Sequence, residues 1–158
     1  MFALPRFAPQ KRGRADDPIA WRVREWQRQG VPLLPPLTHA EIAGRSRLAG
    51  KPLSADVVRL YSLCGGMRDG EDDKSLFSLW PLERALHESL DYRDGLIPFA
   101  DGIISSFTFC LKMEDVSETA SVYIDYGGDT PPKRAAASLA EAFDLLLRDP
   151  LVLGLPPD

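Results

Sequence analysis

The sequence predicts an α+β domain in which a mostly antiparallel sheet packs against helices. Helical patterns predominate between residues 18 and 64, strand-like segments with one short helix among them follow between residues 76 and 126, and a last helical pattern comes after them. Strands joined by short connections pair antiparallel, and strands segregated from helices are typical of α+β proteins. We therefore expect one sheet, covered by helices on one face.

The length and composition fit a single globular domain. The chain has 158 residues, of which 44% are hydrophobic and 27% are charged. Two cysteines, Cys64 and Cys110, are too few for a disulfide scaffold and favour a reducing compartment. No apolar run approaches the roughly 18–20 residues of a membrane span, and the first residues lack the apolar stretch of a signal peptide. We expect a cytoplasmic protein with no membrane contact.

Charge divides the chain into two unequal parts. Residues 1–59 hold 11 Lys and Arg against 5 Asp and Glu, which gives +6, and residues 60–158 hold 8 against 18, which gives −10. The acidic part would repel nucleic acid, so a nucleic-acid role is disfavoured. We divide the chain into a flexible basic arm (1–17), the domain (18–150) and a C-terminal tail (151–158).

The first predicted helix is bounded by residues that begin and end helices. Asp17 is placed as an N-cap, Pro18 follows at the first helical position, and Gly30 ends the helix. Residues 31–37 contain three prolines, which remove backbone donors and favour an extended backbone. They predict an extended strap across the domain.

Two further helices follow the strap. Thr38 and Glu41 form a capping box that begins the second helix, and Gly50 ends it. Ser54 caps the third helix, which stops at the Gly65-Gly66 pair. The charged loop after this pair runs from Met67 to Lys74.

The second half of the chain predicts the sheet. Residues 107–112 alternate apolar and polar side chains, as a half-buried strand does, and residues 76–80 and 121–126 are two more strands. Residues 97–99 are a short extended piece in which Pro98 favours a sheet edge.

Two more helices accompany these strands. Pro81 opens a short helix among the strands. A turn at Gly127-Gly128-Asp129 follows the last predicted strand, and a second capping box, Ser138 with Glu141, begins the closing helix.

Six short motifs occur in order between residues 18 and 148. They are Leu34-Pro35-Pro36-Leu37-Thr38 with Glu41-Ile42; Leu53 with Leu60-Tyr61 and Cys64-Gly65-Gly66; Leu79-Trp80-Pro81-Leu82-Glu83; Ile97-Pro98-Phe99-Ala100-Asp101; Val122-Tyr123-Ile124-Asp125; and Ser138-Leu139-Ala140-Glu141 with Phe143. In this order they resemble the SUKH superfamily (Smi/Knr-type domains), whose founding member is a yeast regulator of cell-wall synthesis. The chain departs from the family at Cys64, where asparagine is usual, at Ser54, where proline is usual, and near Ser46, where a glutamate is usual.

The resemblance implies a non-enzymatic protein-binding module that needs no cofactor. Bacterial members are mostly regarded as immunity proteins that bind and neutralise a toxin, often a nuclease or deaminase, and eukaryotic relatives are signalling scaffolds. We expect an immunity protein for a basic, nuclease-type toxin. The alternative is a scaffold or regulatory protein of the same fold with an unrelated cellular partner.

The acidic bias suggests where such a partner would bind. Acidic side chains can mimic nucleic-acid phosphates and speed association with a basic protein. The alternative for the acidic loop is an ordinary solvated loop, and Trp80 is either a core residue or an exposed anchor. The candidate partner-binding residues are Asp69, Glu71, Asp72, Asp73, Trp80, Asp101, Tyr123 and Asp125.

Enzyme and metal sites are disfavoured by the residue pattern. A calcium loop starting at Asp69 would need glycine where Lys74 stands and glutamate where Trp80 stands. His39 and His87 are the only histidines, and with two cysteines 46 residues apart they match no zinc spacing. A pair of His87 with either cysteine could in principle make a nucleophile, but no local residue lowers a thiol pKa. Neither glycine pair belongs to a phosphate-binding motif. We therefore expect no catalytic residue and no metal.

Overall fold

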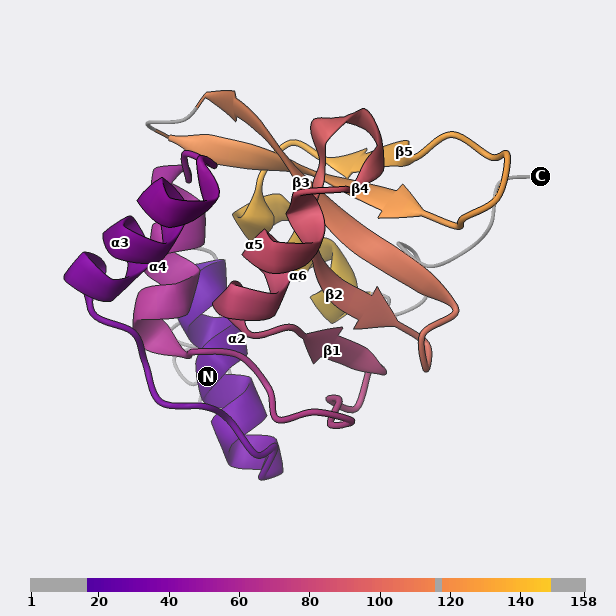
Figure 1. Cartoon of the computed structure of the whole chain (residues 1–158). Helices are drawn as coiled ribbons and strands as arrows, with labels where there is room; N and C mark the ends of the chain where they lie inside the picture. The colour runs from indigo at the N-terminus through magenta and orange to yellow at the C-terminus, as the bar shows by residue number, and fades with distance from the viewer. Residues whose placement is uncertain (1–16, 116–117, 149–158) are drawn as a thin grey trace.

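The computed structural model describes residues 17–115 and 118–148, which form a sheet with helices packed around it (Figure 1). Of the predicted arm (1–17) only Asp17 is described, and the predicted tail (151–158) lies outside the described residues. The helices are α2 (Pro18–Gln29), α3 (His39–Ala49), α4 (Ala55–Leu63), α5 (Leu82–Ser89), the short 3₁₀ helix η1 (Arg93–Gly95) and α6 (Leu139–Arg148). The strands are β1 (Phe77–Leu79), β2 (Ile97–Gly102), β3 (Phe107–Asp115), β4 (Thr119–Asp125) and β5 (Lys133–Ala136).

The five strands form one antiparallel sheet in the order β1-β2-β3-β4-β5, so each strand pairs with its neighbour in sequence. This confirms the predicted α+β class with an antiparallel sheet. Strand β5 was not predicted, because Lys133–Ala136 is short and lacks an alternating pattern. This segment is a strand because it pairs with β4. Ala136 lies opposite Val122, and Arg134 lies opposite Tyr123.

Pro98 lies in an interior strand, which corrects the expectation of a sheet edge. Strand β1 pairs only with residues 100–102 of β2, so Pro98 extends beyond the end of β1 while it faces Cys110 of β3. The β2–β3 register also shifts between Pro98 and Ala100. The missing N–H of the proline therefore falls where β2 has a strand partner on one side only.

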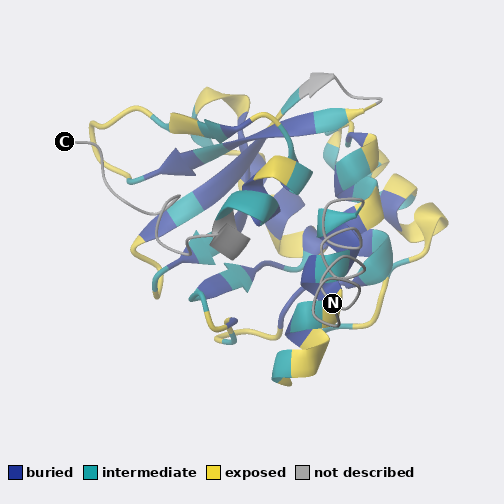
Figure 2. Ribbon diagram, turned by 180° about the vertical axis from the view of Figure 1, so that it is seen from behind, coloured by how far each residue is buried: buried dark blue, intermediate teal, exposed yellow. Residues whose placement is uncertain are grey.

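The core lies between the sheet and the helices (Figure 2). Trp26 of α2 is fully buried, and its ring lies 5.9 Å from that of Phe77 and 6.0 Å from that of Phe143, between centroids. Phe77 also meets Phe109 of β3 at 5.2 Å. This aromatic cluster joins α2, α6 and the sheet, and aromatic pairs at these separations add to the free energy of burial.

The predicted helix starts are mostly confirmed. Asp17 Oδ1 accepts from the N–H of Ala20, and the Thr38–Glu41 capping box is present in both directions. At α6, Ser138 Oγ accepts from the N–H of Glu141 at 3.1 Å.

Ser54 differs from its prediction, because its side chain makes no cap bond although it stands at the N-cap position of α4. Its hydroxyl lies 2.6 Å from Asp56 Oδ1 instead. Asp56 in turn accepts from the N–H of Ala120 in β4, at 3.2 Å, and from the N–H of Leu139 in α6, at 3.3 Å. One carboxylate therefore ties α4, β4 and the start of α6 together.

The strap after α2 runs beside the glycine pair. Leu34 donates its N–H to Gly66 O at 2.8 Å, and Gly65 donates to Leu34 O at 3.1 Å. A Cβ on Gly65 would collide with the carbonyl oxygen of Pro35, and one on Gly66 would lie 2.7 Å from Pro81 Cα. The two glycines thus permit the backbones of three segments to approach closely.

Candidate protein-binding groove

The loop between α4 and β1 forms one wall of a surface hollow of about 440 Å³, which we call the acidic groove. The charged residues that line it are Arg68, Asp69, Glu71, Asp72, Arg84 and Asp101. Four carboxylates and two guanidinium groups sum to −2. Asp69 and Asp72 are exposed, whereas Glu71 and Asp101 are half-buried. The structure thus brings four of the predicted acidic residues to one place.

Trp80 forms part of the groove lining but is only 4% exposed, which agrees with the core alternative. Its Nε1 donates to Asp101 Oδ2 at 2.9 Å, and the Arg84 guanidinium carbon lies 3.7 Å from its ring centroid. Arg84 Nε also donates to Glu88 at 2.8 Å. The indole of Trp80 therefore positions Asp101, and the guanidinium group of Arg84 covers the face of the same ring.

An exposed isoleucine stands at the rim of the acidic groove. Ile104 is 78% exposed and lies in the turn between β2 and β3. Ile103, Ile104 and Ser105 have φ angles of 47°, 53° and 61°, a left-handed conformation that costs about 1–2 kcal/mol per residue for L-amino acids. Sequence reasoning missed this residue, because a lone isoleucine beside a turn carries no periodic signal.

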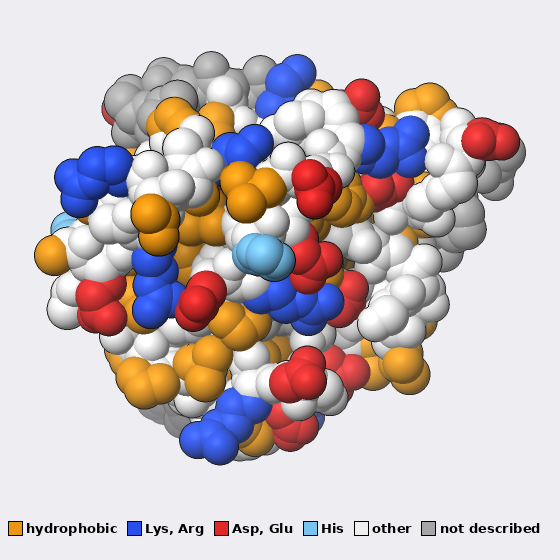
Figure 3. Space-filling view, viewed as in Figure 1, with side chains coloured by type: hydrophobic (Ala, Val, Ile, Leu, Met, Phe, Trp, Pro, Cys, Tyr) orange, Lys and Arg blue, Asp and Glu red, His pale blue; other side chains and the backbone are white. Residues whose placement is uncertain are grey.

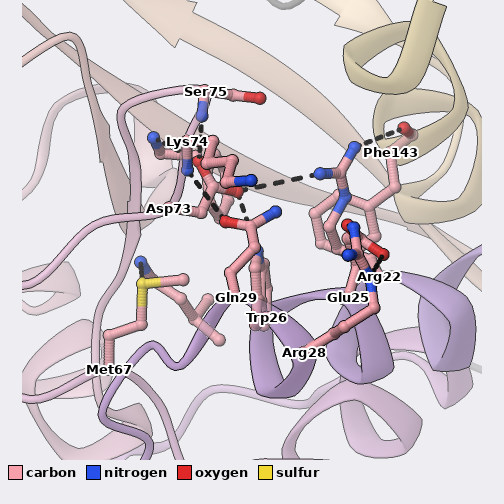
Figure 4. Close-up of polar contacts among 12 residues, drawn as sticks. Arg22, Glu25, Trp26, Arg28, Gln29, Met67, Asp73, Lys74, Ser75 and Phe143 are labelled. Atoms are coloured by element: carbon pink, nitrogen blue, oxygen red, sulfur yellow. Dashed lines mark hydrogen bonds and ion pairs between the residues drawn. The ribbon is translucent and has the colours of Figure 1, made fainter.

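Asp73 is the predicted site residue whose position differs most from the expectation of an exposed loop (Figure 4). Its side chain is buried against α2, where Oδ2 accepts from Trp26 Nε1 at 2.8 Å and lies 3.7 Å from Arg22 Nη1. Its Oδ1 accepts from the N–H groups of Ser75 and Phe77. Asp73 therefore holds the loop in place and does not belong to the exposed wall of the groove.

Further contacts fix the same loop to its surroundings. Gln29 Oε1, at the end of α2, accepts from the N–H of Lys74 at 3.0 Å. Ser78 of β1 donates its hydroxyl to Glu71 O at 2.6 Å. Because the backbone of the acidic segment is held at Glu71 and at Lys74, less of it has to be ordered when a partner binds.

Tyr123 and Asp125 lie apart from the acidic groove. Asp125 is buried, accepts from Tyr92 Oη at 2.6 Å and pairs with Arg93 at 3.4 Å. Asp125 and Asp101 point to the same face of the sheet, because Thr108 of β3 pairs with Asp101 of β2 on one side and with Asp125 of β4 on the other. They are nevertheless separated by two strand spacings of about 4.8 Å each. Tyr123 is half-buried, with Lys112 Nζ 6.0 Å from its ring centroid.

The two cysteines are poor nucleophiles in this structure. Burial raises the pKa of the Cys64 thiol, and burial raises the pKa of Cys110 to about 12. A reactive cysteine needs the opposite shift. Within the described residues, no group of three or more His, Cys, Asp and Glu side chains is arranged to hold a metal ion.

Among the helices of the described residues, none has both the length and the apolar character needed to cross a membrane.

Comparison with known proteins assigns the chain to no family and no function. No protein-family model, no curated protein and no solved structure matches the chain.

Proposed function

We propose that this chain is a non-enzymatic, immunity-type protein that binds and neutralises a basic, nuclease-type toxin through the acidic groove. The observation that carries the proposal is the arrangement of Asp69, Glu71, Asp72 and Asp101 around one hollow, with an exposed Ile104 at its rim. Carboxylates around an apolar contact suit a partner surface that carries arginine or lysine beside hydrophobic side chains.

The rest of the chain's charge supports the same kind of partner. Residues 60–158 carry −10, and the groove lies entirely within this part of the chain. A nuclease must present a basic surface to hold nucleic acid, and an acidic protein placed on that surface would block it. Opposite charge also raises the association rate, which matters for an inhibitor that must capture its target quickly.

The resemblance of the ordered motifs to the SUKH superfamily supports the immunity role, and membership of that superfamily is part of the proposal. Two of the resembling motifs have structural roles that suit a binding module. The Cys64-Gly65-Gly66 motif lets the strap and the start of α5 approach, and the Trp80 motif forms one wall of the groove. Neither role requires a catalytic group.

The test is co-expression with a basic, nuclease-type toxin domain, to be sought among the genes that neighbour this one, together with a binding measurement on the purified pair. The wild-type chain should keep cells alive, and Asp69→Lys with Asp72→Lys should lower the association rate by about tenfold or more at low salt. The matched control is Asp91→Lys with Asp129→Lys, because both residues are exposed, lie outside the groove and change the net charge equally.

Three outcomes separate the alternatives. Cell death in the presence of soluble, folded wild-type chain would contradict the immunity role. Tight binding of another cellular protein through the same groove, without protection, would favour the scaffold alternative. Equal association rates for the groove variant and its control would show that the partner does not bind at the acidic groove.

A further inference from the structure

The turn between β2 and β3 (residues 103–106) stands at the rim of the acidic groove and carries an exposed isoleucine. Ile104 is 78% exposed, and Asp101 and Ser105, on either side of it in the chain, line the same groove. Figure 3 shows acidic side chains gathered over the loop between α4 and β1, with hydrophobic side chains beside them. In the free chain, Ile104 is therefore a large apolar side chain in water with carboxylates next to it.

The backbone of this turn adopts a conformation that isoleucine disfavours. Ile103, Ile104 and Ser105 have φ angles of 47°, 53° and 61°, and Leu76 of the neighbouring loop has φ of 63°. Among the described non-glycine residues, only Asp94 also has a positive φ, so four of these five residues lie beside the acidic groove. Strained backbone of this kind clusters at ligand-binding sites. Glycine would adopt the conformation without steric cost, yet the chain places an exposed isoleucine there.

Hydrogen bonds connect the turn to the loop that forms the opposite side of the groove. Ile103 donates its N–H to Leu76 O at 2.9 Å, and Leu76 donates its N–H to Asp73 O at 2.9 Å. Within the turn, Ser106 Oγ donates to Ile103 O at 2.6 Å. Since Asp73 is itself held by α2, the backbone that carries Ile104 is fixed relative to the acidic loop. Less of this backbone has to be ordered when a partner binds.

We propose that Ile104 is the apolar anchor through which the acidic groove engages its partner, an inference that rests on the proposed function. The side chain enters an apolar pocket of the basic partner, and cations around that pocket meet the carboxylates of the groove. A protruding isoleucine leaves water only in a concave surface, and the carboxylates beside it require that surface to be basic. A few such anchors, surrounded by weaker polar contacts, carry most of the affinity of an interface.

The first test measures association and dissociation rate constants of the purified chain with the inactivated toxin domain of the co-expression test. Ile104→Ala removes apolar surface but no charge. It should raise the dissociation rate constant about tenfold or more and leave the association rate constant within about twofold. Asp69→Lys with Asp72→Lys should act mainly on association. Leu48→Ala is the matched control, because Leu48 is 91% exposed and lies outside the groove, and it should change neither rate constant.

The second test needs no partner, because it measures the strain in the free chain. Ile104→Gly should unfold about 2–4 °C above Ile104→Ala, since glycine adopts the left-handed conformation without the cost that a Cβ imposes. Both variants lack the isoleucine side chain and should dissociate from the toxin domain equally fast. Circular dichroism verifies that both fold.

The outcomes separate this inference from the proposed function. If the toxin domain binds and the groove variant slows association, but Ile104→Ala leaves dissociation unchanged, the anchor is wrong and the proposed function stands. If the toxin domain does not bind the wild-type chain, the proposed function fails, and the anchor that rests on it fails as well. A midpoint of Ile104→Gly no higher than that of Ile104→Ala would overturn the strained presentation of the anchor.

Discussion

The indole Nε1 of Trp26 donates a hydrogen bond to Asp73 Oδ2 at 2.8 Å and so joins helix α2 to a loop 47 residues later in the chain. Arg22, one turn before Trp26, lies 3.7 Å from the same oxygen and donates to Phe143 O at 3.4 Å. Burial lowers the pKa of Arg22, and the Asp73 carboxylate opposes that shift. A buried ion pair thus anchors the loop that forms one wall of the acidic groove.

Replacing Asp73 with alanine should destabilise the fold far more than replacing its neighbour Asp72. Asp73→Ala leaves the Arg22 charge buried without its counterion, which costs about 3–5 kcal/mol. Asp72 is exposed, so Asp72→Ala should change the free energy of unfolding by no more than about 0.5 kcal/mol. Urea denaturation of both variants measures the difference. Similar values for the two would mean that Asp73 does not anchor the loop.

The glycines on the two sides of Arg68 should respond differently to alanine. Gly66 has φ of 125°, and an added Cβ would lie 2.7 Å from Pro81 Cα, so Gly66→Ala should cost about 3 kcal/mol or more. Gly70 has φ of 81°, but no described atom lies within 4 Å of such a Cβ. Gly70→Ala should therefore cost only the conformational strain of about 1–2 kcal/mol. Thermal unfolding distinguishes the two, and an equal loss would contradict the close approach at Gly66.

Asp56 should be a major contributor to stability although it is a helix-surface carboxylate. Asp56→Ala leaves the buried N–H groups of Ala120 and Leu139 without this acceptor, at about 1–3 kcal/mol each. Asp56→Asn keeps one acceptor oxygen and should lose less. Hydrogen exchange should show faster exchange at Ala120 and Leu139 in the alanine variant. Unchanged exchange at both amides would refute this role.

Alkaline pH should destabilise the fold through buried groups whose pKa is raised, among them Tyr61 and Cys110. Burial, then proximity to Cys64, raises the pKa of Tyr61 above its ordinary value of 10.0, and burial raises the pKa of Cys110 from 9.0 to about 12. Between these values the unfolded chain loses protons that the folded chain keeps. Stability is therefore fully present below about pH 8 and falls above pH 9, by up to about 1.4 kcal/mol per pH unit for each group.

Tyr61→Phe tests the source of this alkaline dependence. The variant removes one of these groups, so its stability should fall less steeply above pH 10 than that of the wild type, whatever its stability at neutral pH. Urea denaturation at several pH values between 7 and 11 gives both slopes. Parallel curves for variant and wild type would show that Tyr61 titrates equally in both states.

Local patterns predicted the elements whose determining contacts lie within one turn. The Thr38–Glu41 capping box and the Asp17 cap could be identified because donor and acceptor are three residues apart. The alternation of residues 107–112 identified β3, and the fold class followed from the order of the elements. Gly30 and Gly50 end helices in the left-handed conformation that glycine favours.

The candidate site was only partly predictable. The charged loop indicated an acidic surface, and Asp69, Glu71 and Asp72 do share a groove with Asp101. The same charge pattern could not separate Asp73 from its neighbours, because its burial depends on Trp26 and Arg22 from a distant helix. Nor could periodicity place Tyr123 and Asp125, which lie on another part of the sheet.

The sequence by itself therefore determined most of the helix ends and the extended segments of β1 to β4, because these depend on neighbouring residues, and it showed that the acidic charge follows residue 59. Only the tertiary structure decided that Lys133–Ala136 is a strand, that Asp73 is a buried anchor, and that Ile104 and Leu48 remain exposed on different surfaces. Each of these depends on contacts or exposure set by residues far apart in the chain, and such contacts form only when the whole sheet and its helices pack together.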